Sequence, residues 1–291
     1  MSTAATAAGE RSLPLAGVEL GGTKCVCILA HGPGAILEQV TLPTGDQEVT
    51  LSSIRAILGG WHFAALGIAS FGPLDLVRGR IGETPKPGWS GADLSALYQG
   101  VPTVIDTDVN GAALAEGRWG AAQGLTSWAY ITVGTGIGVG SIVAGRPVQG
   151  LGHSEAGHLR VPRTNSSWPG ACPFHGDCVE GLASGPAIAL RTGQRGETLS
   201  PDHQVWEDVA EALSGVCHNL ALTTLPERIL IGGGIVTDRP ELLAMIRVRL
   251  GASLAGYGAT AGLDLEQYLL RPALGALAGP LGAIALGAER R

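Results

Sequence analysis

The sequence predicts an α/β protein built from two similar halves, because two glycine-rich hairpins of the same plan recur about one domain apart. The first spans Leu15 to Leu29, where two apolar strands are joined by Gly-Gly-Thr-Lys. The second spans Ala129 to Val143, with Gly-Thr-Gly at its turn. The 291 residues are enough for two such domains facing each other.

Composition excludes several classes of protein. Hydrophobic residues make up 45% of the chain, so we expect disorder only in the Ala/Ser/Thr-rich tail of residues 1–12. The net charge is −6 without any lysine or arginine block, which argues against nucleic acid as a partner. Five cysteines, an odd number, fit a reducing cytoplasm better than secretion, and no signal peptide is expected.

One uncharged stretch, residues 119–145, superficially resembles a membrane span. Its apolar residues alternate with period two and it is dense in glycine, which predicts strand, turn and strand instead. We therefore expect no membrane partner.

The other elements follow in order. Between the hairpins we expect a helix around Thr50–Leu58, a buried strand Ala65–Ala69, a Pro-rich loop Thr84–Trp89 and a strand Thr103–Ile105 that runs into Asp106–Asn110. A helix follows, with Asn110 near its cap. Further on we expect a helix Asp202–Leu225, a strand Arg228–Ile231, a helix Pro240–Leu250, a short strand Leu269–Leu270 and an Ala/Leu-rich helix from Gly279. We divide the chain into a smaller domain, residues 13–115, to which a helix at about 277–291 returns, and a larger domain, residues 116–276.

A metal site is predicted in the larger domain. Cys172, His175 and Cys178 form a C-x-x-H-x-x-C motif, and His158 lies upstream of it. Thiolate and imidazole ligands at such short separations suit tetrahedral zinc, and four protein ligands indicate a structural ion. The alternative is a pair of buried cysteines with two incidental histidines. Because Glu155 and Glu180 flank these ligands, a bound ion would fix both carboxylates at a polar substrate site.

Three glycine turns are candidate phosphate sites, because backbone N–H groups without a nearby Cβ can approach one anion together. They are Gly21, Gly22, Thr23 and Lys24; Gly134, Thr135 and Gly136; and Gly232, Gly233 and Gly234. A single such turn is more often a tight hairpin, but three together favour phosphate. No Walker motif occurs, and the one G-x-G-x-x-A match, Gly256–Ala261, lacks a βαβ context.

Carboxylates accompany these turns. Asp106 and Asp108 end a buried strand, where one of them could accept the proton of a hydroxyl that attacks phosphorus. The alternative is that both cap the next helix. Glu19 and Asp75 are candidate partners for magnesium or for a substrate hydroxyl.

Lysine usage is unusual, because Lys24 and Lys86 are the only lysines and both lie in Gly- or Pro-rich motifs. This suggests that lysine was kept only where a compact ammonium group is needed in a crowded site. Chance is the alternative.

These motifs together resemble one family. GVELGGTK, SFGPLD, TPKPGW, DTDVNGAALAEG, HSEAGHL, CPFHGDCVEGLASGPAI and IGGGI, spread from about Leu15 to Gly282, resemble the ROK-family sugar kinases and in particular their bacterial fructokinase branch. The resemblance implies the actin-like ATPase fold, with two RNase H-like domains around a nucleotide cleft. It also implies ATP-dependent phosphorylation of D-fructose to fructose 6-phosphate, with Mg²⁺ and a structural Zn²⁺ as cofactors.

The resemblance also implies roles for particular residues. Asp108 matches the catalytic base, and the three glycine turns match the two phosphate loops and the adenosine side. Matches to sugar contacts are Glu155, His158 and Glu180, with Thr107 and Gly72 completing the expected substrate-binding set. His158, Cys172, His175 and Cys178 match the zinc ligands, so that His158 would bind metal with one ring nitrogen and face the sugar with the other. Thr107 and His175 replace the Asn and Cys of many members, which suits the fructokinase branch.

Three alternatives remain open from sequence. One is a kinase for mannose, glucose or an N-acetylhexosamine, since glutamates that bind hydroxyls do not specify the sugar. The second is a non-catalytic sugar-sensing module, and the third is a zinc hydrolase, which a closed four-ligand site opposes. Family repressors carry an N-terminal helix-turn-helix domain, for which no room is expected before Leu15. Family members are often dimers, so a homodimer is an assembly that the resemblance allows.

Overall fold

Two five-stranded sheets form the framework of the computed structural model, which describes residues 13–289. The first sheet has the order β3 (Ile36–Pro43), β2 (Lys24–Ala30), β1 (Leu15–Leu20), β4 (Leu66–Ser70) and β7 (Thr103–Thr107). The second has the order β10 (Arg146–Pro147), β9 (Ile137–Val143), β8 (Trp128–Val133), β11 (Arg228–Gly232) and β12 (Leu269–Leu270). In each sheet the central strand pairs antiparallel with its hairpin partner and parallel with the strand on its other side. This shared order and direction confirm the predicted duplication.

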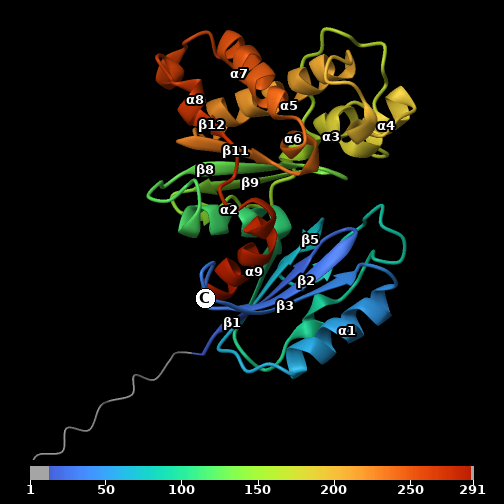
Figure 1. The fold of residues 1–291 in the computed structure, drawn as a ribbon, viewed down its shortest axis with the longest axis vertical. Helices are drawn as coiled ribbons and strands as arrows, with labels where there is room; N and C mark the ends of the chain where they lie inside the picture. The colour runs from blue at the N-terminus through green and yellow to red at the C-terminus, as the bar shows by residue number, and fades with distance from the viewer. Residues whose placement is uncertain (1–12, 290–291) are drawn as a thin grey trace, which may run out of the picture.

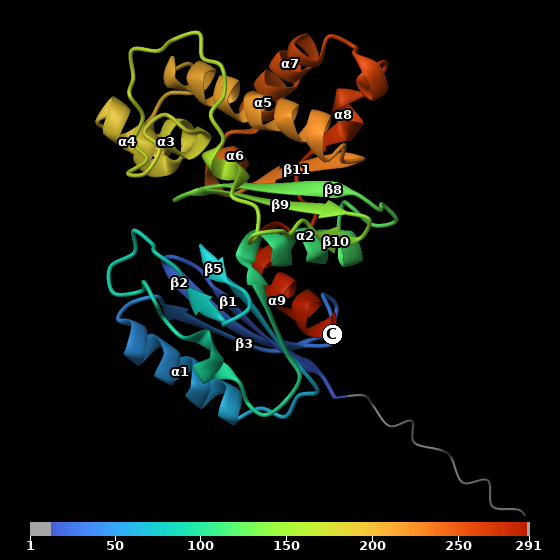
Figure 2. The same cartoon turned by 180° about the vertical axis from the view of Figure 1, so that it is seen from behind.

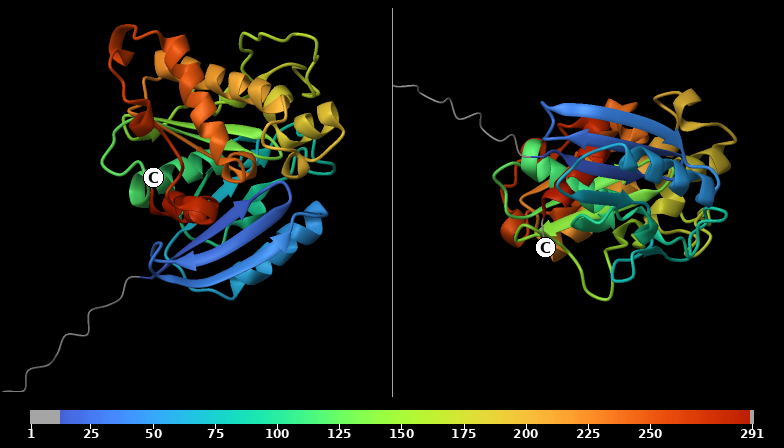
Figure 3. Two further views of the ribbon diagram at one scale, coloured as in Figure 1. Left: turned by 45° about the horizontal axis from the view of Figure 1, so that its top comes forward. Right: turned by 90° about the horizontal axis from the view of Figure 1, so that it is seen from below.

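The helices form layers around these sheets (Figure 1). Two of them, α2 (Asp108–Trp119) and α9 (Ala278–Ala288), lie between the sheets, with α9 against β1 and β4 and α2 against β8 and β9. The outer face of the first sheet is covered by α1 (Gln47–Gly59), and that of the second by α5 (Val205–Thr223) and α7 (Pro240–Leu254). The view from behind shows the same order of layers (Figure 2), and two further views show the red helix α9 against the blue strands (Figure 3).

Strand periodicity explains how each sheet serves two layers. Along β8, Ala129 and Ile131 belong to the outer core with α5 and α7, whereas Trp128 and Tyr130 belong to the inner core with α2 and α9. Alternate side chains of a strand point to opposite faces, so an almost wholly apolar strand is required here.

Glycines allow the two inner helices to approach each other and the first sheet. A Cβ on Gly282 would lie 2.5 Å from the backbone carbon of Gly111, and one on Gly67 of β4 would lie 1.8 Å from the carbonyl oxygen of Ala283. Since backbone atoms cannot move aside, these contacts require glycine.

The remaining elements are short. They are β5 (Leu74–Asp75), β6 (Arg80–Ile81), α3 (Val179–Ala183), α4 (Gly185–Thr192), α6 (Gly234–Thr237), α8 (Leu265–Tyr268) and the 3₁₀ turns Leu94–Leu97, Ala156–His158, Gly196–Thr198, Gly258–Thr260 and Gly275–Leu277. Gly256–Ala261 thus forms a turn with a 3₁₀ segment, consistent with no βαβ nucleotide fingerprint there. Over residues 13–289, no helix combines the length and apolar character needed to cross a membrane.

The predicted elements are present, with shifted ends. The helix expected at Thr50–Leu58 begins at Gln47, because the Asp46 side chain accepts the Val49 N–H (3.1 Å) and caps it. Asn110 was expected near the cap of the next helix, and it lies close to the cap without being the cap residue. Thr107 is the cap and its side-chain oxygen accepts the N–H of Asn110 (3.2 Å), which leaves Asn110 inside α2.

The domain division stays a prediction, and its boundary at residues 115/116 falls inside α2. The final helix expected at about 277–291 is α9, which lies on the first sheet. The predicted disordered tail, residues 1–12, and residues 290–291 lie outside the described part of the chain.

Candidate active site

The candidate residues follow the carboxyl ends of parallel strands in both sheets. In the first sheet β1, β4 and β7 lead into Gly21, Phe71 and Asp108, and in the second β8 and β11 lead into Gly134 and Gly233. Parallel strands end at a common edge, so residues distant in sequence gather there.

Asp108 is the first residue of α2. Its burial raises the pKa of the carboxyl to about 6, and the negative charge of Glu155 adds to that rise. The N–H of Val109 donates to Oδ1 (2.9 Å) and acts in the opposite direction. Asp108 is therefore a carboxylate near neutral pH that accepts protons more readily than an exposed aspartate.

Two of the other candidate carboxylates already have partners within the protein. Asp106 is buried and accepts the Thr107 N–H (2.7 Å) and the Asn110 side-chain amide (2.8 Å), so it braces the start of α2. Asp75 is held by Arg78, whose side chain lies 2.8 Å away, and the hydrogen bonds from Arg78 lower the pKa of Asp75.

Glu19 differs from both of these carboxylates. Burial, followed by the charge of Asp108, raises the pKa of Glu19 to about 7, against the opposing charge of Lys24. Gly279 makes room for this carboxylate, since a Cβ there would lie 2.0 Å from Oε1. Among residues 13–289 no hydrogen-bond partner of the Glu19 side chain is present.

The two glycine hairpins present free donors in the same way. In the first, Gly21 N–H donates to the Lys24 carbonyl (3.0 Å); in the second, Gly134 N–H donates to the Gly136 carbonyl (2.9 Å). Two N–H groups follow in each turn and have no acceptor within the described chain. They belong to Gly22 and Thr23 in the first hairpin and to Thr135 and Gly136 in the second. Both turns thus offer consecutive N–H groups to an anion.

On the other side of Asp108, loops from both halves meet. The buried imidazole of His153 accepts the Leu74 N–H on Nε2 (2.8 Å), so its ring proton is on Nδ1. Nδ1 lies 3.6 Å from Oε1 of Glu155, a carboxylate that is 50% exposed and open to a ligand. Gly72 leaves space for both groups, since a Cβ there would lie 3.3 Å from the His153 ring and 3.6 Å from Glu155. His153 was missed from sequence, where only its motif was noted.

The four predicted metal ligands do converge. Their ligand atoms all lie within 4.8 Å of one another, with Nδ1 of His158 3.6 Å from the Cys172 Sγ and 3.5 Å from the Cys178 Sγ, and Nδ1 of His175 3.7 Å from the Cys172 Sγ. Zn–S and Zn–N bonds of standard length place tetrahedral ligands about 3.6 Å apart. The donor set and its spacing therefore fit zinc.

Glu180, at the start of α3, joins this cluster to the second hairpin. Its Oε2 accepts the Ile137 N–H (2.9 Å), directly after the Gly134–Gly136 turn. Its Oε1 lies 4.0 Å from Nε2 of His158, the ring nitrogen that faces away from the thiols. The carboxylate thus contacts the second hairpin in addition to facing the side where sugar was expected.

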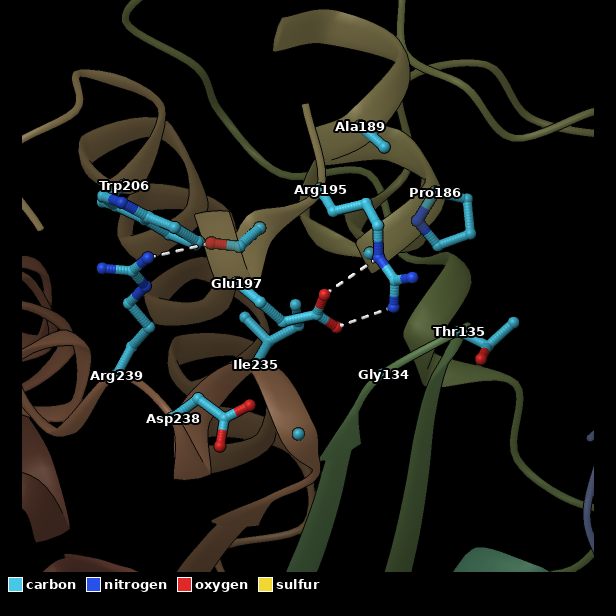
Figure 4. Close-up of a pocket in the computed structure, with 13 residues that line it drawn as sticks. Gly134, Thr135, Pro186, Ala189, Arg195, Glu197, Trp206, Ile235, Asp238 and Arg239 are labelled. Carbon is cyan, nitrogen blue, oxygen red and sulfur yellow. Dashed lines mark hydrogen bonds and ion pairs between the residues drawn. The ribbon is translucent and has the colours of Figure 1, made fainter. Parts of the chain in front are cut away.

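A cavity of about 480 Å³ opens beside the second hairpin, at the ends of α4, α5 and α6 (Figure 4). Its walls include Gly134, Thr135, Gly185, Pro186, Ala189, Arg195, Gly196, Glu197, Trp206, Gly234, Ile235, Asp238 and Arg239. Buried Arg239 packs over Trp206 and donates to the Gly196 carbonyl (2.8 Å), which makes one wall rigid. Arg195 pairs with Glu197 (2.9 Å) and extends toward Thr135.

Of the residues that line this cavity, only Gly134, Thr135 and Gly234 are among those predicted from the sequence, where Gly232, Gly233 and Gly234 were expected on the adenosine side. Gly234 alone of that trio lines the cavity, because the faces of Gly232 and Gly233 that lack Cβ pack against Pro272 and the backbone of Val133. No residue of the first hairpin is part of the lining. Thr107, predicted to contact substrate, is buried and its hydroxyl oxygen is used to cap α2.

Comparison with known proteins places the chain in a family. The model of the ROK family matches residues 15–290. A fructokinase from Zymomonas mobilis is 39% identical, covering 92% of this chain and 94% of its own, and one from Pediococcus pentosaceus is 34% identical, covering 94% and 96%. The crystal structure of a ROK family glucokinase from Streptomyces griseus, in complex with glucose and AMPPNP, is 25% identical with a TM-score of 0.76 and covers 95% and 99%. With its duplicated α/β fold and these relatives, the chain belongs to the ROK family.

Proposed function

We propose that this protein is a fructokinase, which transfers the γ-phosphoryl group of ATP to the 6-hydroxyl of D-fructose. The observation that carries this proposal is Asp108, a carboxyl with a raised pKa at the start of α2, close enough to Glu19 of β1 and to Glu155 for their charges to interact with it. Kinship with fructokinases over nine-tenths of the chain supports fructose as the sugar.

Asp108 acts as the general base in this mechanism. The hydroxyl of the sugar donates a hydrogen bond to its carboxylate and transfers the proton as the oxygen attacks phosphorus. The position of the carboxylate at the start of α2 is fixed by the Asp106 and Thr107 hydrogen bonds, so the base is oriented before substrate arrives.

Each substrate has its own set of residues. Glu155, His158, Glu180 and Gly72 bind the sugar, with Glu155 as the most accessible acceptor for its hydroxyls. The base and ribose of ATP occupy the cavity next to Gly234, and the phosphates extend from Thr135 toward Gly22 and Thr23. Catalysis then consists of alignment and charge neutralisation, with little covalent chemistry from the protein.

Two metal ions are part of the proposal. Glu19 is the carboxylate suited to hold Mg²⁺, because it is half-buried, has no hydrogen-bond or ion-pair partner within residues 13–289 and lies close to Asp108, whereas Asp75 is neutralised by Arg78. When bound, Mg²⁺ neutralises phosphate charge. Zinc on His158, Cys172, His175 and Cys178 holds the sugar-binding loop in its folded form.

The substrate is tested by ADP release from MgATP in the presence of fructose, glucose, mannose or N-acetylmannosamine. We expect release with fructose far above the others. Preferred release with another sugar would change the substrate assignment, and release with none would favour the sugar-sensing module.

The Asp108→Asn variant should lose about 10²–10⁴-fold in kcat and still show a thermal shift with fructose, because only the base is removed.

The raised pKa of Asp108 predicts a pH profile. Since the base must be ionised, kcat/KM should rise with pH through about 6, fall to about a tenth of its plateau one pH unit below that value, and be flat above 7. A rate independent of pH between 5 and 8 would contradict the assignment.

The ionisation of Asp108 affects stability in the opposite sense. Its folded pKa lies above its unfolded value, so its contribution to stability is present below pH 4 and is lost as pH rises through 6. Asp108→Asn, which mimics the protonated form, should therefore unfold at a higher temperature than wild type at pH 8.

The metal cluster predicts about one zinc per chain in purified protein, measured by elemental analysis. Cys178→Ser should lose the metal, lower the unfolding temperature and raise the KM for fructose, because His158 and Glu180 lose their support. The matched control is Cys217→Ser, a buried thiol of α5 outside the cluster, which should keep its zinc. Retention of full metal content by Cys178→Ser would remove this thiol from the ligand set.

His153 is expected to position the sugar site. Replacing it with leucine removes the acceptor for Leu74 N–H and the donor next to Glu155, so the KM for fructose should rise about tenfold while the KM for ATP is unchanged. His153→Gln keeps an acceptor near the place of Nε2 and should recover part of the loss. An unaltered fructose KM in His153→Leu would show that the imidazole only fills space.

A further inference from the structure

Both lysines of the chain lie at the first glycine hairpin. Lys24 begins β2, immediately after the turn. Lys86 comes from the Pro-rich loop 84–89, more than sixty residues away in sequence. Its Nζ donates to the carbonyl oxygens of Gly22 (2.7 Å) and Thr44 (3.0 Å). The lysine bias noted in the sequence therefore has a common location.

The three consecutive carbonyl groups of this turn each accept a hydrogen bond. The Thr44 hydroxyl donates to the Gly21 carbonyl (2.7 Å), Lys86 to that of Gly22, and the Thr44 N–H to that of Thr23 (2.9 Å). Each carbonyl shares a peptide unit with the N–H of the next residue, so the units that carry the N–H groups of Gly22, Thr23 and Lys24 are all held from behind. A donor on a carbonyl also polarises its peptide unit and makes the N–H a stronger donor.

Among these three contacts only the one from Lys86 is charged. Hydrogen bonds with an ionised donor are the stronger class, and an ammonium group can serve two carbonyls at once. The loop that carries Lys86 has an anchor of its own, because the buried Trp89 donates from Nε1 to the Gly45 carbonyl (3.0 Å). Removal of the ammonium group alone therefore leaves the loop attached.

We propose that Lys86 is a positioning residue for the nucleotide phosphates. It fixes the peptide unit between Gly22 and Thr23 with its N–H toward the bound phosphates and strengthens that donor, and it does so through the peptide without touching the nucleotide. The inference rests on the proposed function, because the hairpin must be a phosphate loop. Its consequence is that Lys86 affects affinity only for ligands that carry phosphates.

The test is isothermal titration of adenosine, ADP and AMPPNP into wild type, Lys86→Met and Lys86→Arg, with steady-state kinetics alongside. Lys86→Met should bind ADP and AMPPNP about tenfold more weakly and adenosine as wild type does, with an unchanged KM for fructose. Lys86→Arg keeps a charged donor and should recover most of the affinity.

A charge-matched control separates this local effect from the loss of one positive charge. Arg146→Met removes an exposed cation from β10, at the edge of the second sheet, and should bind ADP as wild type does. ADP affinity of Lys86→Met equal to wild type, or an equal loss for adenosine and ADP, would overturn the inference alone. Failure of the wild-type protein to bind any nucleotide would overturn the proposed function and this inference with it.

Discussion

The packing of α2 between the two sheets is the constraint on which the rest of the structure depends. The helix continues directly from β7 of the first sheet, yet its first turn packs on β9 of the second, where Cβ atoms on Gly138 or Gly140 would lie 2.4 Å from Val109. On its other side Gly111 meets Gly282 of α9. Because glycine backbones meet without intervening side chains, α2 can be placed in only one way, and the position of Asp108 follows from it.

Both hairpins present consecutive N–H groups without an acceptor in the described chain, but different contacts support them. In the first, a lysine and a threonine from loops of the same half hold the carbonyls from behind. In the second, the Gly134 carbonyl accepts the Gly185 N–H (2.8 Å), and a carboxylate, Glu180, accepts the N–H that follows the turn. Duplication therefore explains the shared backbone, whereas the supporting side chains are particular to each half. The Lys86 ammonium group at the first hairpin favours an anionic ligand there. The Glu180 carboxylate connects the second hairpin to His158 of the predicted metal cluster.

Local sequence patterns were enough to predict the framework of the fold. Contacts between residues that are distant in the sequence could not be predicted. The period-two hairpins, the buried strand at Arg228 and the cysteine spacing are each encoded within a few residues, and their positions were predicted well. The cap residue of α2 could not be chosen from sequence, because Thr107 and Asn110 are both good capping residues and only the backbone decides between them. His153 and most of the lining of the cavity beside the second hairpin could not be predicted, since these residues are brought together only by the fold, as His153 is with Leu74.

The proposed sugar site contains a hydrogen bond that joins the two halves in the absence of any ligand. The bond from Leu74 to His153 joins the loop after β4 to the loop that precedes the metal cluster, and the ring proton left on Nδ1 faces Glu155. Any relative motion of the halves would have to break this hydrogen bond or pivot close to it. A pivot there would keep Glu155 and Gly72 in place around the sugar while the hairpins separate, because these residues lie next to the bond and the hairpins do not. The His153 imidazole and helix α2 thus have similar effects. Each fixes the position of a carboxylate, Glu155 or Asp108, by a contact between the two halves.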